Sequence, residues 1–408
     1  MLQQAIIQQV IDVQKQKIQR QGTGLQRELL PDLPNLQSHA LIISGIRRCG
    51  KSTLLKQFLN RNEQNALHLN FEDPRLFNFE LTDFQLLDNI IADSKHTVLF
   101  FDELQIIDGW ELYVRQKLDE GFRVIITGSN ASLLSRELGT KLTGRHITKE
   151  LFPFSYKEFL SFKSLEADVR SLQKYLDMGG FPEYLKTNNE DILTTLFYDI
   201  LNRDIVVRHG IRDVSMLKRL VVYLISNVGN LVTANKLQQP LGFRTTNTIL
   251  EYLSFLEDTY LVNFMPKFSY SLKAQSVNPR KVYVIDSGII KIASTTFTDN
   301  FGHLLENLIY WELRRNGKEL FYFNENGAEC DFVVTKNEKV EQLIQVCYEL
   351  TPENREREQR GLREAMDFFK ADNGLIITYK QKDAYMQNGK QIDIFPAYEF
   401  LGKKKIFF

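Results

Sequence analysis

The stretch at residues 45–53 constrains the fold of this chain more than any other part of its sequence. It reads Gly-Ile-Arg-Arg-Cys-Gly-Lys-Ser-Thr and fits the pattern G-x-x-x-x-G-K-[ST] without a mismatch. The residues just before it, 41–44, form a short apolar, β-branched run typical of a buried parallel strand, and 51–59 carries leucines and a phenylalanine at helical spacing. A strand, a glycine turn and a helix N-terminus follow one another, as a phosphate-binding loop requires. The alternative, an ordinary glycine turn before a helix, fits these flanks less well.

Each residue type in this stretch has a role in binding a phosphate group. The glycines let backbone N–H groups close around a β-phosphate, and the helix N-terminus adds its partial positive charge. Lys51 is expected to reach the β- and γ-phosphates, and the Ser52 hydroxyl is expected to bind Mg²⁺. The residues predicted to bind the nucleotide are Gly45, Arg47, Arg48, Cys49, Gly50, Lys51, Ser52 and Thr53.

A second motif follows about fifty residues further along the chain. The apolar run at 97–101 predicts a strand, and Asp102 and Glu103 come directly after it. Asp102 is expected to hold Mg²⁺ through a water molecule, and Glu103 to orient and deprotonate the attacking water. Acids are common at the ends of strands, so this interpretation depends on the pairing with the glycine-rich stretch.

Polar residues that are further candidates for the site flank two more predicted strands, at 123–127 and 146–151. The first leads to Ser129 and Asn130, either of which is a candidate to sense the γ-phosphate; capping of a helix at 131–138 is the equal alternative. Arg145 precedes the second strand and is a candidate to reach a phosphate, in its own chain or in a neighbour's. A solvated arginine beside a turn is the alternative. The catalytic candidates are Lys51, Glu103, Asn130 and Arg145.

Residues 214–285 have the pattern of a winged helix-turn-helix domain. Helices are expected at 217–227, 233–239 and 245–258, and strands at 260–264 and 280–285. The expected wing, 263–281, has basic residues and no acid, so its charge suits a phosphate backbone. Its basic residues are Lys267, Lys273, Arg280 and Lys281. The third helix, however, carries Glu251, Glu257 and Asp258, which argues against insertion into a DNA groove, and domain packing is the alternative role.

From residue 286 onward the pattern is again α/β. Glu306 lies on a predicted helix, Asp331 on one strand and Gln345 on the next. Restriction-nuclease-like folds assemble one Mg²⁺ site from acids placed in this way, and a lysine polarises the attacking water. Cys347 stands at the position of that lysine and supplies no fixed positive charge, so nuclease activity is not expected. Lys336 and Lys339 are nearby in sequence as substitutes.

Net charge and cysteine spacing limit the partners that the sequence predicts. The 51 basic and 51 acidic residues balance, so any nucleic acid must be bound by a local patch. The three cysteines, Cys49, Cys330 and Cys347, lack metal-ligand spacing, which predicts a reducing compartment without disulfides. No apolar run approaches ~18 residues, and the first four residues lack a signal-peptide pattern. The expectation is a cytoplasmic protein without a membrane partner.

Taken in order, these motifs resemble the prokaryotic AAA-type ATPases that end in a nuclease-like domain of unknown function. The resemblance covers nearly the whole chain. It rests on 45–53, 101–103, 127–130, 144–145, the Gly-Gly-Phe-Pro-Glu segment at 179–183, 306–307 and 329–331. It implies a P-loop ATPase core with a parallel sheet of the additional-strand type, a winged helix and a restriction-nuclease-like C-terminal domain. Many such proteins carry Glu-Val-Lys where this chain has Gln345, Val346 and Cys347.

The fold class expected is therefore α/β, in five parts. These are an N-terminal helix and connector at 1–38, a P-loop AAA-type ATPase domain at 39–160, a helical linker at 161–213, a winged helix at 214–285 and a nuclease-like domain at 286–408. The function expected is hydrolysis of MgATP that moves the last two domains against a partner, either a protein or another copy of the chain. The preference for ATP comes from the resemblance alone. The alternative is an ATP-controlled nucleic-acid-binding protein with an inactive nuclease fold.

Overall fold

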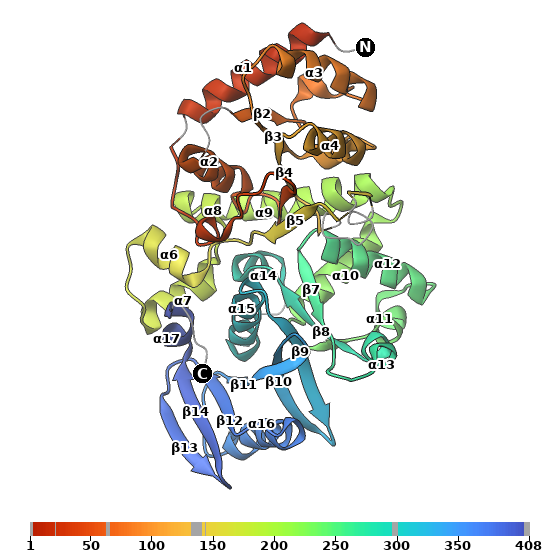
Figure 1. Cartoon of the computed structure of the whole chain (residues 1–408). Helices are drawn as coiled ribbons and strands as arrows, with labels where there is room; N and C mark the ends of the chain where they lie inside the picture. The colour runs from red at the N-terminus through yellow and green to blue at the C-terminus, as the bar shows by residue number, and fades with distance from the viewer. Residues whose placement is uncertain are drawn as a thin grey trace. The chain divides into compact units, whose positions relative to one another are not determined.

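The computed structural model describes residues 3–20, 22–62, 66–131, 141–142, 144–295 and 301–403. The chain divides into two compact units, Met1–Phe152 and Pro153–Phe408 (Figure 1). Most of the helix predicted at 131–138 lies outside the described residues. None of the described helices combines the length and the apolar character needed to cross a bilayer.

The first unit is built on a five-stranded parallel sheet in the order β2-β3-β4-β1-β5. The strands are β1 (Ala40–Ser44), β2 (Ala66–Asn70), β3 (Val98–Asp102), β4 (Arg123–Gly128) and β5 (His146–Glu150). β4 pairs in parallel with both β1 and β3, so the additional strand lies where it was predicted. The apolar runs of β1 and β3 are buried throughout, as central parallel strands are. The carboxyl ends of all five strands meet at one edge of this sheet.

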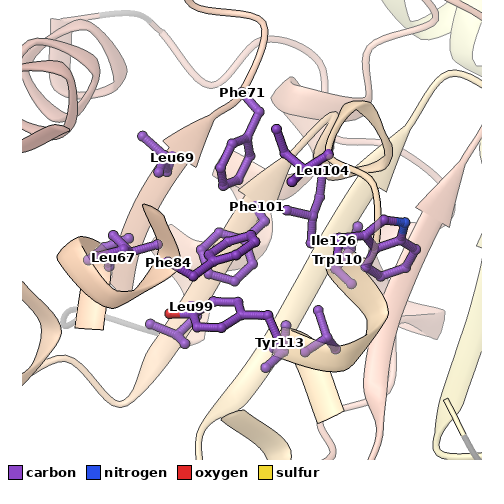
Figure 2. Close-up of a cluster of buried hydrophobic side chains, with 14 of the residues drawn as sticks. Leu67, Leu69, Phe71, Phe84, Leu99, Phe101, Leu104, Trp110, Tyr113 and Ile126 are labelled. Carbon is purple, nitrogen blue, oxygen red and sulfur yellow. The ribbon is translucent and has the colours of Figure 1, made fainter. Parts of the chain in front are cut away.

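Four of the described helices belong to this unit: α1 (Gln4–Arg20), α2 (Lys51–Asn62), α3 (Phe84–Ala92) and α4 (Trp110–Asp119). The amphipathic helix α1 buries Ile7, Val10 and Ile11 and packs against β2 and α3, so it is part of this unit. Aromatic rings fill the core between strands and helices (Figure 2). Phe84 of α3 stacks on Tyr113 of α4 with 3.9 Å between ring centroids. Helix α4 was not among the predicted elements.

The second unit opens with helices and continues with a small sheet. The helices are α6 (Tyr156–Lys163), α7 (Val169–Met178), α8 (Pro182–Thr187) and α9 (Glu190–Asp199), followed by a π-helical stretch, Ile200–Val207. Next come α10 (Val214–Ser226), β6 (Leu231–Val232), α11 (Ala234–Leu241), α12 (Thr246–Asp258), β7 (Val262–Met265) and β8 (Arg280–Val284). The three strands form an antiparallel sheet in the order β6-β8-β7. The predicted elements of this region are present, and a short helix, α13 (Leu272–Val277), lies in the expected wing.

A six-stranded mixed sheet, in the order β13-β14-β12-β11-β10-β9, completes the second unit. Its strands are β9 (Glu319–Glu325), β10 (Ala328–Lys336), β11 (Lys339–Cys347), β12 (Asn373–Thr378), β13 (Asp383–Gln387) and β14 (Lys390–Pro396). The helices are α14 (Ser287–Ala293), α15 (Phe301–Arg315), α16 (Arg355–Phe369) and α17 (Ala397–Gly402). α16 packs closely on β10. A Cβ on Gly361 of α16 would lie only 1.9 Å from the carbonyl oxygen of Glu329 in β10, so only glycine fits there.

The Gly-Gly-Phe-Pro-Glu segment joins α7 to α8 and is held by Asp286. Gly179 has a φ of +71°, and a Cβ there would lie 2.0 Å from Asp286 Oδ1. The Gly180 N–H donates to Asp286 Oδ2 at 2.6 Å. A Cβ on Gly180 would lie 2.3 Å from the carbonyl oxygen of Phe154. Gly179 is therefore explained by its positive φ and the Asp286 side chain, and Gly180 by close packing on the Phe154 backbone.

We expect Gly180→Ala to lower the free energy of unfolding by about 1–3 kcal/mol, because the added methyl group has no space beside Phe154. Urea unfolding of the full chain, followed by tryptophan fluorescence, measures this. Gly22→Ala is the control, since nothing lies within 4 Å of a Cβ there. An unchanged midpoint for Gly180→Ala would show that the backbone relaxes without cost.

His68 of β2 makes the first unit sensitive to acid. Its ring lies 4.6 Å from that of Phe100, and burial lowers its pKa to about 4. Between about pH 6.5 and pH 4 the folded state binds fewer protons than the unfolded chain, so stability present at pH 7 falls as the pH is lowered. We expect a loss of about 3 kcal/mol from this residue. In urea unfolding at pH 7 and pH 4, His68→Gln should show a smaller loss, and His39→Gln should behave as the parent chain.

Candidate functional site

The candidate nucleotide site lies at the carboxyl edge of the parallel sheet, where residues 45–53 follow β1. A Cβ on Gly45 would lie 2.0 Å from the carbonyl oxygen of Leu151, so no larger residue fits there. Gly50 has a φ of +103°, a conformation that side chains rarely adopt. Both glycines of the motif are therefore required by the backbone itself.

Lys51 and Ser52 open α2 and direct two different groups toward this edge. The Lys51 side chain is buried, and its Nζ donates to the carbonyl oxygens of Gly45 at 2.8 Å and Ile46 at 3.2 Å. The Ser52 hydroxyl donates to Asp102 Oδ2 at 3.0 Å. The two predicted Mg²⁺ ligands, Ser52 and Asp102, are thus in direct contact.

Asp102, at the end of β3, is held from the strands on both of its sides. The Thr127 hydroxyl of β4 donates to Asp102 Oδ1, and Asn70 Nδ2 of β2 donates to Asp102 Oδ2 at 3.4 Å. Burial raises the pKa of Asp102, and the Thr127 hydrogen bond opposes this shift. Asn70 and Thr127 were not predicted as partners of Asp102, because the strand order that brings them together is not visible in the sequence.

Glu103 has the geometry of a positioned base. Its backbone is left-handed, with a φ of 55°, which is unusual for a residue other than glycine. Its Oε2 accepts hydrogen bonds from the Ser129 N–H at 3.2 Å, the Ser129 hydroxyl at 3.1 Å and the Gln105 amide at 2.5 Å. Its Oε1 lies 4.0 Å from Lys51 Nζ. Burial raises the pKa of Glu103, which makes the carboxylate a better proton acceptor.

The structure distinguishes the two sensor candidates by their contacts. Ser129 binds Glu103, whereas the carbonyl oxygen of Asn130 accepts a hydrogen bond from the Ser44 hydroxyl at 2.7 Å. Both residues are buried at the end of β4. The sheet edge therefore brings together Lys51, Ser52, Asp102, Glu103, Ser129 and Asn130.

Arg145 lies elsewhere in this unit. Its carbonyl oxygen accepts a hydrogen bond from the Ala40 N–H at the start of β1, and its Nη1 lies 2.7 Å from Asp119 Oδ1. Because β1 and β5 are parallel, Arg145 is at the amino edge of the sheet, about 16 Å from the other edge. Contact with a phosphate bound by its own chain does not fit this geometry, and action on a neighbouring chain stays a prediction.

Arg27 is a buried contact of the glycine-rich loop that the sequence analysis missed. Its side chain is almost fully enclosed, at 2% exposure. Nη1 donates to the carbonyl oxygen of Cys49 at 2.7 Å, and Nη2 donates to that of Phe152 at 2.8 Å. The guanidinium thus ties the loop to the residues after β5. The sequence shows only an arginine in a connector, so no signal could have identified it.

A cavity of about 530 Å³ opens beside Ser52 and Asp102. Helix α1 contributes Gln14 to its wall, and β2 contributes Asn70. A hydroxyl and a carboxylate 3.0 Å apart at a cavity wall are a donor set that Mg²⁺ prefers. The residues present therefore fit a Mg²⁺ ion bound with nucleotide phosphates.

The second unit brings together the acids predicted from the C-terminal pattern. Glu306 of α15 and Asp331 of β10 are both buried, and the Asp331 N–H donates to Gln345 Oε1 of β11 at 3.2 Å. Lys281 Nζ lies 2.9 Å from Glu306 Oε1 and 2.8 Å from Asp331 Oδ1. Burial raises the pKa of Glu306 to about 7. The suggested substitutes, Lys336 and Lys339, instead pair with each other's backbone where β10 turns into β11.

The prediction that the charge of Lys281 suits a phosphate backbone is therefore wrong, because its ammonium is buried among carboxylates. Its side chain is 3% exposed, and its ammonium also lies 2.7 Å from Glu329 Oε1. Lys267 and Arg280 of the same segment pair with Glu325 at 2.9 Å and Glu257 at 3.6 Å. Much of the positive charge of this segment is thus used inside the unit, because acids from other elements face it.

Comparison with known proteins identifies two family descriptions along the chain. Residues 37–160 match an AAA domain, AAA_14, and residues 169–300 match a domain of unknown function, DUF8612. Uncharacterized protein MJ1544 of Methanocaldococcus jannaschii is 38% identical over 368 residues, which cover 84% of this chain and 82% of that protein. An uncharacterized protein of Haemophilus influenzae is 33% identical over 337 residues, covering 77% of this chain and 83% of that protein.

Solved structures show weaker likenesses. The Thermotoga maritima RuvB Holliday junction branch migration motor is 17% identical and covers 62% of this chain and 88% of its own, with a TM-score of 0.30. Cdc6p from Pyrobaculum aerophilum is 14% identical and covers 74% of this chain and 95% of its own, with a TM-score of 0.26. Scores this low do not establish a shared arrangement, so the assignment of this chain depends on its own sheet and on the AAA match.

We expect Arg27→Met to weaken nucleotide binding about tenfold or more, because hydrogen bonds from a buried charged group to the loop are worth about 1.5–3 kcal/mol. Binding of a fluorescent ATP analogue to the full chain measures this. Arg20→Met, at the exposed end of α1, is the matched control and should bind as the parent chain does. Equal affinities for both variants would contradict a role for Arg27 in holding the loop.

Proposed function

Because this chain belongs to the family of AAA-domain proteins represented by its two relatives, we propose that it binds MgATP at residues 45–53 and hydrolyses it. The observation that carries the proposal is the contact between Ser52 and Asp102 at 3.0 Å, with Glu103 held next to it by Ser129. A scaffold that only bound nucleotide would not need a buried, oriented carboxylate at position 103.

The side chains at the sheet edge have separate roles in this proposal. Lys51 Nζ, which donates to loop carbonyl oxygens, would exchange these for phosphate oxygens. Ser52 and Asp102 would hold Mg²⁺, which neutralises charge on the phosphates. Glu103 would accept the proton of the attacking water, and Ser129 would keep its carboxylate in place. Ser129 thus joins the catalytic candidates beside Asn130.

Arg145 has a role in this proposal only between copies of the chain. Arg145 lies at the amino edge of the sheet and pairs with Asp119. The phosphate that it would reach must therefore belong to a nucleotide bound by a neighbouring chain. A positive charge supplied in this way stabilises the transition state of phosphoryl transfer. The proposal therefore includes an oligomer in which Arg145 exchanges Asp119 for a neighbour's nucleotide.

We further propose that ATP hydrolysis moves residues 214–285, as a winged helix, and 286–408, as a nuclease-like domain, against a partner. Residues 214–285 contain the predicted helices and an antiparallel three-stranded sheet, which supports a winged helix. The alternative is ATP-controlled binding of nucleic acid. Tyr270, which is 83% exposed two residues before α13, favours it, since exposed aromatic rings stack on bases.

We expect the purified chain to hydrolyse MgATP and Glu103→Gln to lose at least about 100-fold of the rate, because the general base is removed. Steady-state phosphate release measures both. Glu28→Gln, in the exposed connector of the same unit, is the matched control and should retain the parent rate. Absence of turnover in the parent chain would overturn the hydrolase proposal and leave a nucleotide-dependent binding protein.

The same assay with mixed DNA and RNA separates the two partner proposals. Stimulation of the parent chain by nucleic acid, reduced by Tyr270→Ala, would support the nucleic-acid alternative. A rate that is indifferent to nucleic acid would favour a protein partner. Salt titration is the accompanying measurement, because contacts with phosphates weaken steeply as salt is raised.

A further inference from the structure

Four charged side chains form a cluster in the second unit that ATP hydrolysis does not use. We call it the Lys281 cluster, and it consists of Lys281, Glu306, Glu329 and Asp331. Lys281 Nζ lies 2.7–2.9 Å from one carboxylate oxygen of each acid. Glu306 and Asp331 are the two acids that the sequence pattern assigned to a metal. The cation that they share in this structure is an ammonium.

We propose that the Lys281 ammonium is the resident cation of this carboxylate site and takes the place of a divalent metal. A metal shared by Glu306 and Asp331 would lie between Oε1 and Oδ1, about 2.0–2.1 Å from each for Mg²⁺. Lys281 Nζ already lies between these two oxygens, at 2.9 and 2.8 Å. An ammonium and a metal cannot occupy the same position, so the residues of the site do not fit a bound metal while Lys281 stays there.

Other polar groups hold the carboxylates in place around the Lys281 ammonium. Tyr283 donates its hydroxyl hydrogen bond to Glu306 Oε1 at 2.7 Å. The Val346 N–H donates to Asp331 Oδ2 at 2.9 Å, the oxygen that Lys281 does not contact. Gln345, which stands where a carboxylate ligand was expected, donates to Glu358 Oε2 at 2.8 Å and thus faces another acid. With Lys281 in place, no group of three or more acids, histidines or cysteines in the described parts of the chain is arranged to hold a metal ion.

The site opens onto a cavity, so an ion could reach its acids if the ammonium were removed. The Lys281 cluster lines a cavity of about 820 Å³, which is also lined by His303, Arg357 and Asn354. Glu329, at the wall of this cavity, is 37% exposed. Three carboxylates surround one positive charge, so removal of Lys281 would leave a group of acids that attracts a divalent cation.

The cluster also joins separate parts of the second unit. Lys281 comes from β8 of the three-stranded sheet, whereas Glu306 comes from α15 and Asp331 from β10 of the six-stranded sheet. The same ammonium that replaces a metal therefore links the predicted winged helix to the predicted nuclease-like domain. The proposal is independent of ATP hydrolysis in the first unit.

Mn²⁺ binding to the full-length protein without nucleotide tests the proposal. Every protein in this test carries Asp102→Asn, which removes the carboxylate that is proposed to bind metal in the first unit. Electron paramagnetic resonance measures bound Mn²⁺. We expect the protein with Lys281 to bind no Mn²⁺ in the second unit, and Lys281→Ser to bind one Mn²⁺ ion per chain there. Adding Asp331→Asn to Lys281→Ser should abolish this site. Lys267→Ser, which frees the exposed Glu325, is the matched control and should gain no site.

Two results would overturn the proposal. One is Mn²⁺ binding by the protein that retains Lys281, if Asp331→Asn abolishes this binding. A metal would then displace the Lys281 ammonium from the acids. The other is a folded Lys281→Ser variant, as judged by circular dichroism, that binds no Mn²⁺. If Lys281→Ser does not fold, the comparison of Lys281-containing protein with and without Asp331→Asn still decides the question.

Discussion

The insertion of β4 between β1 and β3 is the constraint on which the candidate ATP site depends. Parallel pairing aligns the ends of three strands, so Ser44, Asp102 and Thr127 reach the same edge although many residues separate them in sequence. Buried β1 and β3 make this pairing rigid, because a shift in register would remove apolar side chains from the core. Glu103 gains its orientation from the tip of β4 through Ser129, and therefore also depends on this strand.

Within each unit, one buried cation joins segments that are far apart in the sequence. Arg27 joins the glycine-rich loop to the residues after β5, and Lys281 joins β8 to α15 and β10. Burial of a charge is costly unless it is paired and hydrogen-bonded. Both side chains meet this condition, since carbonyl oxygens surround one and carboxylates surround the other.

The two carboxylate sites of the chain differ in the cation that they suit. In the first unit Asp102 contacts a serine hydroxyl, and this pair of oxygen groups suits a metal ion. In the second unit Asp331 contacts an ammonium that belongs to the chain. Acids at the ends of strands therefore do not define a metal site by themselves. The groups that face them decide which cation is bound.

Local sequence patterns predict the α/β class, the glycine-rich loop, the positions of Ser52, Asp102 and Glu103, and most strands of the five-stranded sheet. Local patterns sufficed because strand periodicity and the loop motif are properties of neighbouring residues. Tertiary structure alone decided the partners: Asn70 and Thr127 for Asp102, Arg27 for the loop, and Lys281 for Glu306 and Asp331. It also placed Arg145 at the edge away from the loop. Those contacts join residues far apart in the chain, and only strand order and packing bring them within reach.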